Sequence, residues 1–338
     1  MNCYLYGIIE SDGAKNFGTI GFEKGSVAAL SNPSAKLRAG QNLAAVIGPA
    51  PQERFDGLSK ERLVKALLAH QETLETIMKS QFILPCKFGT VLKDEEEVTE
   101  LLSQNETLLE EWLNKMKNRC EMDVLANWDT QAILKEIAAT DPEIVELKRH
   151  LQSLPLAEQQ SKKLSLGMLV SAKLKENAKR YAGEIQMALK EASESYATHD
   201  VMNDEMVFNA SFLLARDGED FFFKALEGLD KQYQGNLNFK CVGPLPPYSF
   251  ATVTLKRFDQ EQIYWAHEAL RLKGSVEVDQ VNRAYKNIAR QCHPDTHPEL
   301  NKKEFEAVHQ AYELLVEYYQ GGTKPVKVSL FSVNGDIG

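Results

Sequence analysis

The stretch QCHPDTHP, residues 291–298, joins two segments whose apolar residues recur at helical spacing, and it determines how the C-terminal part of the chain can fold. Pro294 and Pro298 lack a backbone N–H donor and cannot continue a helix, so the two helices must part here. The polar tripeptide His293-Pro294-Asp295 is therefore expected in a turn at the end of a helical hairpin. This layout predicts a docking surface.

Two faces of different chemistry are predicted for the helix that precedes the tripeptide. Its apolar face consists of Val281, Ala284, Tyr285, Ile288 and Cys292. Arg283, Lys286 and Arg290 lie three and four residues apart, so they form a basic stripe on another face. The following helix, about residues 299–319, has an apolar face of Phe305, Val308, Ala311, Tyr312 and Leu315. The two helices can pack antiparallel and leave the basic stripe exposed, with a short upstream helix covering the remaining apolar edge.

The same region resembles the J-domain of DnaJ-type co-chaperones. EALRLKGSVEVDQVNRAYKNIARQCHPD follows the pattern of that family without a gap, and FEAVHQAYELL matches its third helix. The resemblance covers about residues 263–320 and implies an all-α unit that binds a DnaK-type chaperone and stimulates its ATPase. The residues implied to contact an acidic face of the chaperone are His293, Pro294, Asp295, Arg283, Lys286 and Arg290.

The chemistry of these residues suits an acidic partner, because a basic stripe steers an acidic surface toward it. Asp295 can also form a charge-assisted pair with an arginine. Four departures from the family pattern concern the strength of stimulation, and one of them is a short loop between the two helices. Arg271 replaces a glycine, Cys292 replaces an aromatic residue, and no Gly/Phe-rich or zinc-finger region follows. The alternative is therefore a J-like helical unit that no longer recruits a chaperone.

The composition indicates an ordinary soluble protein with room for two or three domains. The chain has 338 residues, of which 43% are hydrophobic and 26% are charged. A formal net charge of -9 argues against general affinity for nucleic acids or anionic membranes. The five cysteines are scattered and form no C-x-x-C pair, which favours free thiols in a reducing cytosol. Without a basic leader or a membrane-spanning apolar run, a cytoplasmic protein is expected.

An α+β fold is predicted for the body of the chain, with a ferredoxin-like sandwich in residues 1–130. The expected strands are residues 3–9, 43–48, 82–92 and 121–129, the last of which closes the sheet. One helix starts after Ser59, with Arg62 where a capping box would place a glutamate. The other is capped by Asp94 and begins with three glutamates, the charge that its dipole prefers.

Residues 131–255 are predicted to form a helical hairpin and a second α+β domain. Residues 160–200 are almost uninterrupted helix formers, with a coiled-coil-like seam. The seam consists of Ser171, Leu174, Ala178, Tyr181, Ile185, Ala188 and Ala192. From Val207 the pattern becomes strand, helix, strand and strand. Residues 256–262 are expected to be a polar linker, and residues 321–338 a flexible tail.

Residues 1–255 contain no constellation typical of an enzyme. There is no phosphate-binding glycine loop, no H-E-x-x-H and no G-x-S-x-G. We therefore expect neither a catalytic site nor a cofactor, and an enzyme of unknown chemistry is the least favoured interpretation. No metal site is expected, because Pro294 and Pro298 prevent a helical i,i+4 pair of ligands near the tripeptide. The residues considered as ligands were Cys292, His293, His297 and His309.

The body of the chain is similar to the gas vesicle GvpF/GvpL family over residues 1–255. In AHQETLETIMKSQFILPCKFGTVLKDEEEVTELL, a histidine-containing helix precedes a Leu-Pro-x-x-Phe-Gly-Thr strand and an acidic-headed helix. The matching residues are His70, Leu84, Pro85, Phe88, Gly89 and Thr90. A Gly-Pro-x-Pro-Pro-Tyr-x-Phe signature follows far downstream. Its residues are Gly243, Pro244, Pro246, Pro247, Tyr248 and Phe250, with Leu245 where tryptophan is common.

The family resemblance implies an accessory role in gas vesicle formation, in the cytoplasm or at the vesicle. It implies the apolar GvpA-type shell protein and other accessory gas vesicle proteins as partners, with neither nucleic acid nor membrane. Most motif residues are expected to serve the backbone, with glycines in turns and prolines at corners, and direct contact with the shell protein is the alternative. The whole chain is thus predicted to be an assembly factor that binds shell protein and recruits a DnaK-type chaperone. The alternative is a minor structural component of the vesicle with an inactive J-like unit.

Overall fold

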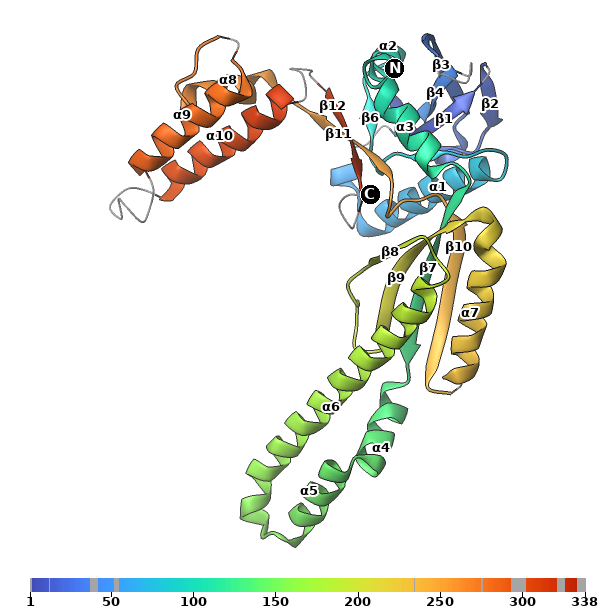
Figure 1. The fold of residues 1–338 in the computed structure, drawn as a ribbon, viewed down its shortest axis with the longest axis vertical. Helices are drawn as coiled ribbons and strands as arrows, with labels where there is room; N and C mark the ends of the chain where they lie inside the picture. Colours follow the sequence, from blue (N-terminus) through green and yellow to red (C-terminus); the bar gives the residue numbers. More distant parts are fainter. Residues whose placement is uncertain are drawn as a thin grey trace. The chain divides into compact units, whose positions relative to one another are not determined.

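The computed structural model describes residues 2–11, 13–36, 42–51, 55–233, 235–274, 276–292, 302–320 and 326–332. The chain forms two compact units (Figure 1). Unit 1 comprises residues 1–252 together with 331–338, and unit 2 comprises Val253–Leu330. Unit 1 combines helices with sheets, and the core of unit 2 is helical, so the predicted α+β class with a C-terminal helical unit is confirmed.

The first sheet of unit 1 is antiparallel and has the strand order β2-β3-β4-β1-β5, with β6 also paired to β1. Its strands are β1 (Cys3–Ser11), β2 (Lys15–Gly18), β3 (Val27–Lys36), β4 (Asn42–Pro49), β5 (Leu84–Pro85) and β6 (Val91–Leu92). β1 is the most apolar of them, and its residues are almost all buried, which places it at the centre of the sheet. Gly7 in β1 permits the close approach of β5, because a Cβ atom there would lie 2.6 Å from the Leu84 carbonyl oxygen.

Three helices and two short 3-10 turns accompany this sheet. They are η1 (Phe22–Lys24), η2 (Phe55–Gly57), α1 (Lys60–Met78), α2 (Glu95–Gln104) and α3 (Glu106–Met116). The two predicted caps are confirmed: the Ser59 hydroxyl accepts the Arg62 N–H, and Asp94 Oδ1 accepts the Glu97 N–H at 2.9 Å. The helix predicted after Asp94 is divided in two at Asn105.

The second sheet of unit 1 is antiparallel with the order β10-β7-β9-β8. Its strands are β7 (Arg119–Trp128), β8 (Ser195–Thr198), β9 (Met206–Ala215) and β10 (Leu237–Leu245). The expectation that residues 121–129 close the first sheet is wrong, because β7 pairs with β9 and β10 instead. With the helices between β7 and β8 and between β9 and β10, this sheet has the β-α-β-β-α-β order of the ferredoxin-like motif.

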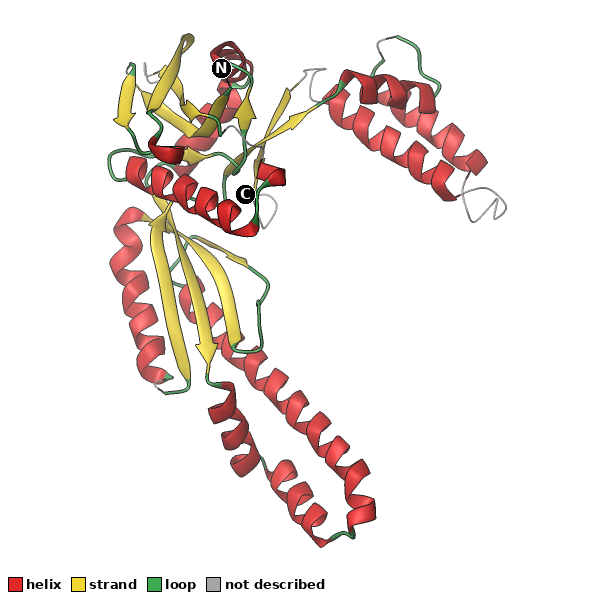
Figure 2. Cartoon of the chain, turned by 180° about the vertical axis from the view of Figure 1, so that it is seen from behind, coloured by secondary structure: helices red, strands yellow, loops and turns green. Residues whose placement is uncertain are grey.

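The helices of the second sheet are α4 (Thr130–Thr140), α5 (Pro142–Ser153), α6 (Leu156–Lys190) and α7 (Glu219–Gln232), and η3 (Arg216–Gly218) precedes α7. The predicted helical hairpin is present, since α4 and α5 pack against α6 and extend beyond the sheet (Figure 2). Of the predicted seam, Tyr181 and Ile185 are buried in the core and Ser171 is exposed. The helix ends earlier than predicted, because Ser195–Thr198 is a strand.

Unit 2 contains β11 (Thr252–Arg257), α8 (Gln260–Ala269), α9 (Val278–Cys292), α10 (Lys302–Gln320) and β12 (Val326–Phe331). β11 and β12 form a two-stranded ribbon, in which the Thr254 hydroxyl donates to the Ser329 carbonyl at 3.1 Å. The predicted linker at 256–262 and flexible tail at 321–338 are therefore wrong in part, because both contribute to this ribbon or to α8. Sequence alone did not reveal that KVSLF has a strand partner in β11.

We expect Gly7→Ala to destabilise unit 1 by about 1–3 kcal/mol, because the added methyl group would overlap the Ile83 side chain and the Leu84 carbonyl. Gly167→Ala in α6 is the matched control, since a Cβ there meets nothing within 4 Å. The free energy of unfolding of that control should rise by about 0.5–1 kcal/mol, because alanine has less conformational entropy than glycine in the unfolded chain. Thermal unfolding measures both variants, and equal melting temperatures for Gly7→Ala and wild type would contradict the close approach.

Candidate functional site

The basic stripe lies on the exposed side of α9. Arg283, Lys286 and Arg290 are all exposed, and their spacing of three and four places them on one face of the helix. Val281 on the opposite face is fully buried in the core of unit 2. His293, Pro294 and Asp295 lie outside the described residues, and their assigned role stays a prediction.

An aromatic contact between α9 and α10 holds the basic face in its orientation. The rings of Tyr285 and Tyr312 are stacked with centroids 4.1 Å apart. The Tyr285 hydroxyl is 3.1 Å from His309 Nδ1, and the Tyr312 hydroxyl donates to Asn282 Oδ1 at 3.0 Å. Because residue 282 pairs with 312 and residue 285 with 309, the two helices are antiparallel, as predicted. Each tyrosine contacts the opposite helix through both its ring and its hydroxyl, so rotation of α9 would break these polar contacts.

The first turn after α8 explains one departure from the family pattern. Arg271 stands where a glycine is usual, and its φ of 54° lies in the left-handed region. The Leu272 N–H donates to the His267 carbonyl at 2.8 Å, which is the hydrogen bond of a helix end closed by a left-handed residue. Arg271 thus adopts a left-handed conformation that glycine accepts more easily, which adds strain at this residue.

The N-terminal family motif surrounds a buried histidine. His70 on α1 is only 4% exposed, and its Nδ1 is 3.0 Å from the Tyr4 hydroxyl. That hydroxyl accepts the Gly89 N–H at 3.0 Å, so its own proton is available for His70. Burial lowers the pKa of His70 to about 4, which keeps the imidazole neutral at physiological pH. The Phe88 ring lies edge-on to His70, with centroids 5.6 Å apart.

The remaining residues of this motif shape the chain around the same core. Leu84 and Pro85 are buried in β5, where Pro85 pairs with Gly7. Gly89 has a φ of 85°, which disfavours any residue with a side chain. The Thr90 hydroxyl donates to the Lys87 carbonyl at 2.6 Å and closes the turn. These contacts agree with a backbone role for the motif.

The C-terminal motif comprises the end of β10, which pairs with β7, and the loop of residues 246–250 that follows it. Gly243 has a φ of 154°, and a Cβ there would overlap Met122 and lie 2.8 Å from the Glu121 carbonyl. Pro246, Pro247 and Phe250 are buried. Their burial turns the chain inward, while Gly243 and Pro244 remain exposed.

A buried polar network anchors this loop, and sequence reasoning missed it. Glu121, 2% exposed, accepts hydrogen bonds from the Ser249 N–H at 2.7 Å and the Ser249 hydroxyl at 2.8 Å. The Ser249 hydroxyl also lies 3.0 Å from Ser211 Oγ, which donates to Asp123 Oδ1 and is 2.8 Å from His199 Nε2. The one sequence signal is the pair of acids at positions i and i+2 of a strand, which share a face.

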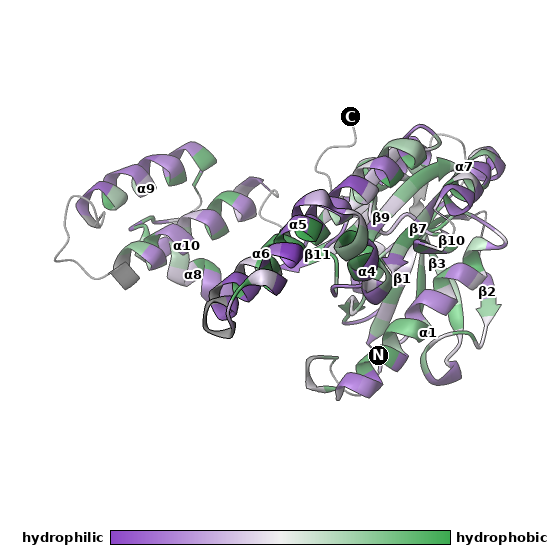
Figure 3. Cartoon of the chain, turned by 90° about the horizontal axis from the view of Figure 1, so that it is seen from below, coloured by the Kyte–Doolittle hydropathy of each residue, from purple (hydrophilic) through white to green (hydrophobic). Residues whose placement is uncertain are grey.

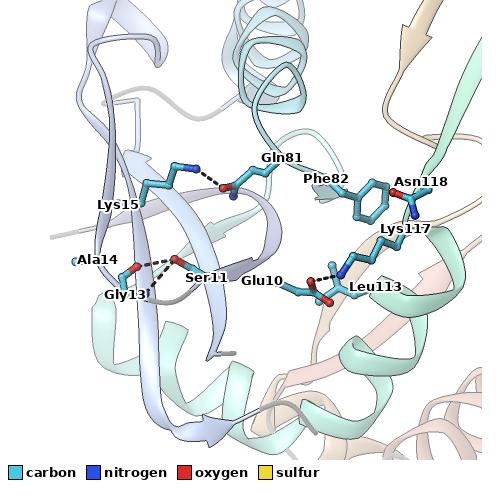
Figure 4. A pocket seen from close by; sticks show the side chains of 10 residues that line it. All are labelled: Glu10, Ser11, Gly13, Ala14, Lys15, Gln81, Phe82, Leu113, Lys117 and Asn118. Atoms are coloured by element: carbon cyan, nitrogen blue, oxygen red, sulfur yellow. Dashed lines mark hydrogen bonds and ion pairs between the residues drawn. The ribbon is translucent and has the colours of Figure 1, made fainter. Parts of the chain in front are cut away.

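A depression of about 560 Å³ in unit 1 lies between the ends of β1 and α3 (Figure 4). Lys117 Nζ pairs with Glu10 Oε2 at 2.7 Å, and Lys15 donates to Gln81 Oε1. Phe82 adds an apolar wall. The lysines that line this depression are engaged by neighbouring side chains, so the observations do not single out a ligand for it.

Burial and the neighbouring Asp123 raise the pKa of Glu121 from its ordinary value near 4.5 to about 8, against the hydrogen bonds from Ser249 and Ser211. Between these values the folded protein holds a proton that the unfolded chain releases, so this group makes the free energy of unfolding fall as the pH rises. We expect the melting temperature of wild type to decrease relative to Glu121→Gln from about pH 5 to pH 8. Parallel melting curves at all pH values would show that Glu121 does not titrate in this window.

Comparison with known proteins agrees with both resemblances. The family described as gas vesicle synthesis protein GvpL/GvpF matches residues 2–252, and the DnaJ domain matches residues 266–319. Gas vesicle protein F of Streptomyces sp. (strain CB03234) is 30% identical over 250 residues, which cover 74% of this chain and 99% of that protein. Gas vesicle protein F of Microcystis aeruginosa (strain PCC 7806) is 26% identical over 216 residues, covering 60% of this chain and 88% of that protein.

Solved structures show the same fold for the body of the chain. The crystal structure of the gas vesicle protein GvpF from Anabaena sp. PCC7120 superposes with a TM-score of 0.60 at 24% identity, covering 73% of this chain and 97% of that one. GvpF from Microcystis aeruginosa gives a TM-score of 0.55 at 23% identity, covering 73% and 98%. No helix in the described part of the chain is long and apolar enough to cross a membrane. With its family match over residues 2–252, the chain belongs to the gas vesicle synthesis protein GvpL/GvpF family and carries a DnaJ domain behind it.

Proposed function

We propose that this protein is a cytoplasmic assembly factor in which two activities are combined. Residues 1–252 bind the apolar gas vesicle shell protein or the nascent wall, and the DnaJ domain recruits a DnaK-type chaperone to it. The observation that carries the proposal is that a DnaJ domain at residues 266–319 follows the GvpL/GvpF family match at residues 2–252 in one chain. An apolar, strand-rich subunit exposes edges that aggregate before assembly, so a holding protein linked to a chaperone meets a physical need.

The surface of α9 supports the chaperone half of the proposal. The formal net charge of the chain is -9, yet α9 carries three basic residues and one acidic residue, Asp279. The basic residues share an exposed face of the helix that directly precedes His293-Pro294-Asp295 in the sequence. A local positive surface on an acidic protein directs an acidic partner to one place and accelerates its association.

We expect the full chain to stimulate the ATPase of a DnaK-type chaperone, and His293→Gln to abolish the stimulation. Arg283→Ala combined with Lys286→Ala should weaken it by about tenfold at low salt, with a smaller difference at high salt, because screening reduces charge steering. Lys273→Ala is the control, since Lys273 is exposed in the same unit but lies outside α9. Equal ATPase rates with wild type and His293→Gln would favour the alternative of a vesicle component with an inactive J-like unit.

We also expect purified shell protein to bind the full chain with equal affinity in wild type and His293→Gln, because residues 1–252 are assigned this task. Pull-down from detergent-free buffer, quantified against a shell-free control, measures the binding. Fragments cut near residue 130 are unsuitable, because β7 would be separated from its partners β9 and β10. Absence of shell protein from the wild-type pull-down would remove the first half of the proposal while leaving the ATPase result intact.

A further inference from the structure

The two halves of α1 differ sharply in burial. The C-terminal half buries His70, Leu74 and Ile77 against the first sheet. In the first nine residues of the helix no side chain is buried, and three large apolar side chains are exposed. Val64 is 46% exposed, Leu67 is 42% exposed and Leu68 is 51% exposed. Their spacing of three and four aligns them as one apolar stripe along the outer side of the helix. Figure 3 shows α1 as a mixture of hydrophobic and hydrophilic residues.

The charges beside this stripe oppose the helix that carries them. Lys60, Arg62 and Lys65 occupy the first two turns of α1, where the helix dipole disfavours positive charge. Glu61 pairs with Lys65 at 2.9 Å, but both side chains are more than 70% exposed, so the pair contributes little. The start of α2 is the reverse case, with Glu95, Glu96 and Glu97 in its first turn. Positive charges that are unfavourable at the start of α1 indicate that they serve an interaction with another molecule rather than the stability of the helix.

We propose that Val64, Leu67 and Leu68, together with Lys60 and Lys65, form a docking face for an amphipathic helix of a partner protein that carries carboxylates beside its apolar stripe. The apolar stripe supplies a ridge that fits the groove of a second helix. The flanking ammonium groups select a partner with negative charges and add little for a neutral one. These five residues are called the α1 docking face below.

A helix suits this face better than a lipid bilayer. The stripe contains only three large apolar residues, which is a short anchor for a membrane surface. The chain as a whole has a net charge of -9, which opposes its approach to an anionic bilayer. A partner helix needs only a local match of apolar and charged groups, and the α1 docking face provides both within two turns.

Site-specific photo-crosslinking in gas-vesicle-producing cells locates the partner. A photoreactive amino acid replaces Leu67 in the full chain, and the same replacement of Met187 is the control, since Met187 is an apolar side chain of α6 that is 63% exposed. We expect the residue at 67, and not the one at 187, to crosslink to a segment with apolar residues at helical spacing and at least two flanking carboxylates. Crosslinks to lipid, to segments without this pattern, or to nothing beyond the control would overturn the proposal.

A synthetic peptide with the sequence of the crosslinked segment then tests the chemistry by fluorescence anisotropy. We expect Leu67→Gln with Leu68→Gln to weaken binding at least tenfold, and Met187→Gln to leave it unchanged. Lys60→Glu with Lys65→Gln should weaken binding at least fivefold at low salt while the melting temperature is maintained, because the favourable charge at residue 60 offsets the loss of the exposed Glu61–Lys65 pair. If Lys60 and Lys65 had only a structural role, their replacement would leave binding of the peptide unchanged. That result would contradict the proposal.

Discussion

The buried carboxyl group of Glu121 is the constraint on which the second half of unit 1 depends. It lies in β7, between β10 and β9, where water cannot solvate it, and it accepts both polar hydrogens of Ser249. Removing Ser249 would leave a buried acceptor unpaired, which costs more than the hydrogen bonds themselves contribute. The loop of residues 246–250 therefore has one favourable position. Tyr248, on the same loop, packs against the core cluster that also contains Tyr4 of the first sheet, so the anchored loop contacts the cores of both sheets.

In the N-terminal motif, buried neutral groups likewise hold distant segments of the chain together by hydrogen bonds. The Tyr4 hydroxyl joins Gly89 to His70 and so fixes the strand segment 84–90 against α1. Motif residues that are buried or engaged in such contacts cannot reach a partner without rearrangement of the core. Recognition of other proteins must then fall to side chains that the core leaves exposed. The outer face of α9 and the first turns of α1 are two such surfaces, and both combine exposure with positive charge on an acidic chain.

Elements with strong local signals could be predicted from sequence, and those defined by distant partners could not. The two faces of α9 follow from spacing alone, because a helix satisfies its own backbone hydrogen bonds. The strand at residues 119–128 was recognised as a strand, yet its sheet was misassigned, since alternation indicates a strand without naming its partner. β12 lies in a segment that is predicted from sequence to be a tail, because its apolar run does not indicate its partner β11 either. The only local signal for the Glu121 network is the pair of acids on one face of a strand, and this pair does not indicate the partner Ser249, which is 128 residues away.

Placing the two proposed binding activities on one chain has a quantitative consequence. A chaperone bound to the DnaJ domain stays at an effective concentration of about millimolar near anything held by residues 1–252, provided that the connection spans the distance. Neither contact then needs high affinity, which suits a factor that must release its client into a growing wall. The ribbon of β11 and β12 matters for this connection, because β11 begins where unit 1 ends and its pairing with β12 fixes the backbone conformation of residues 252–257.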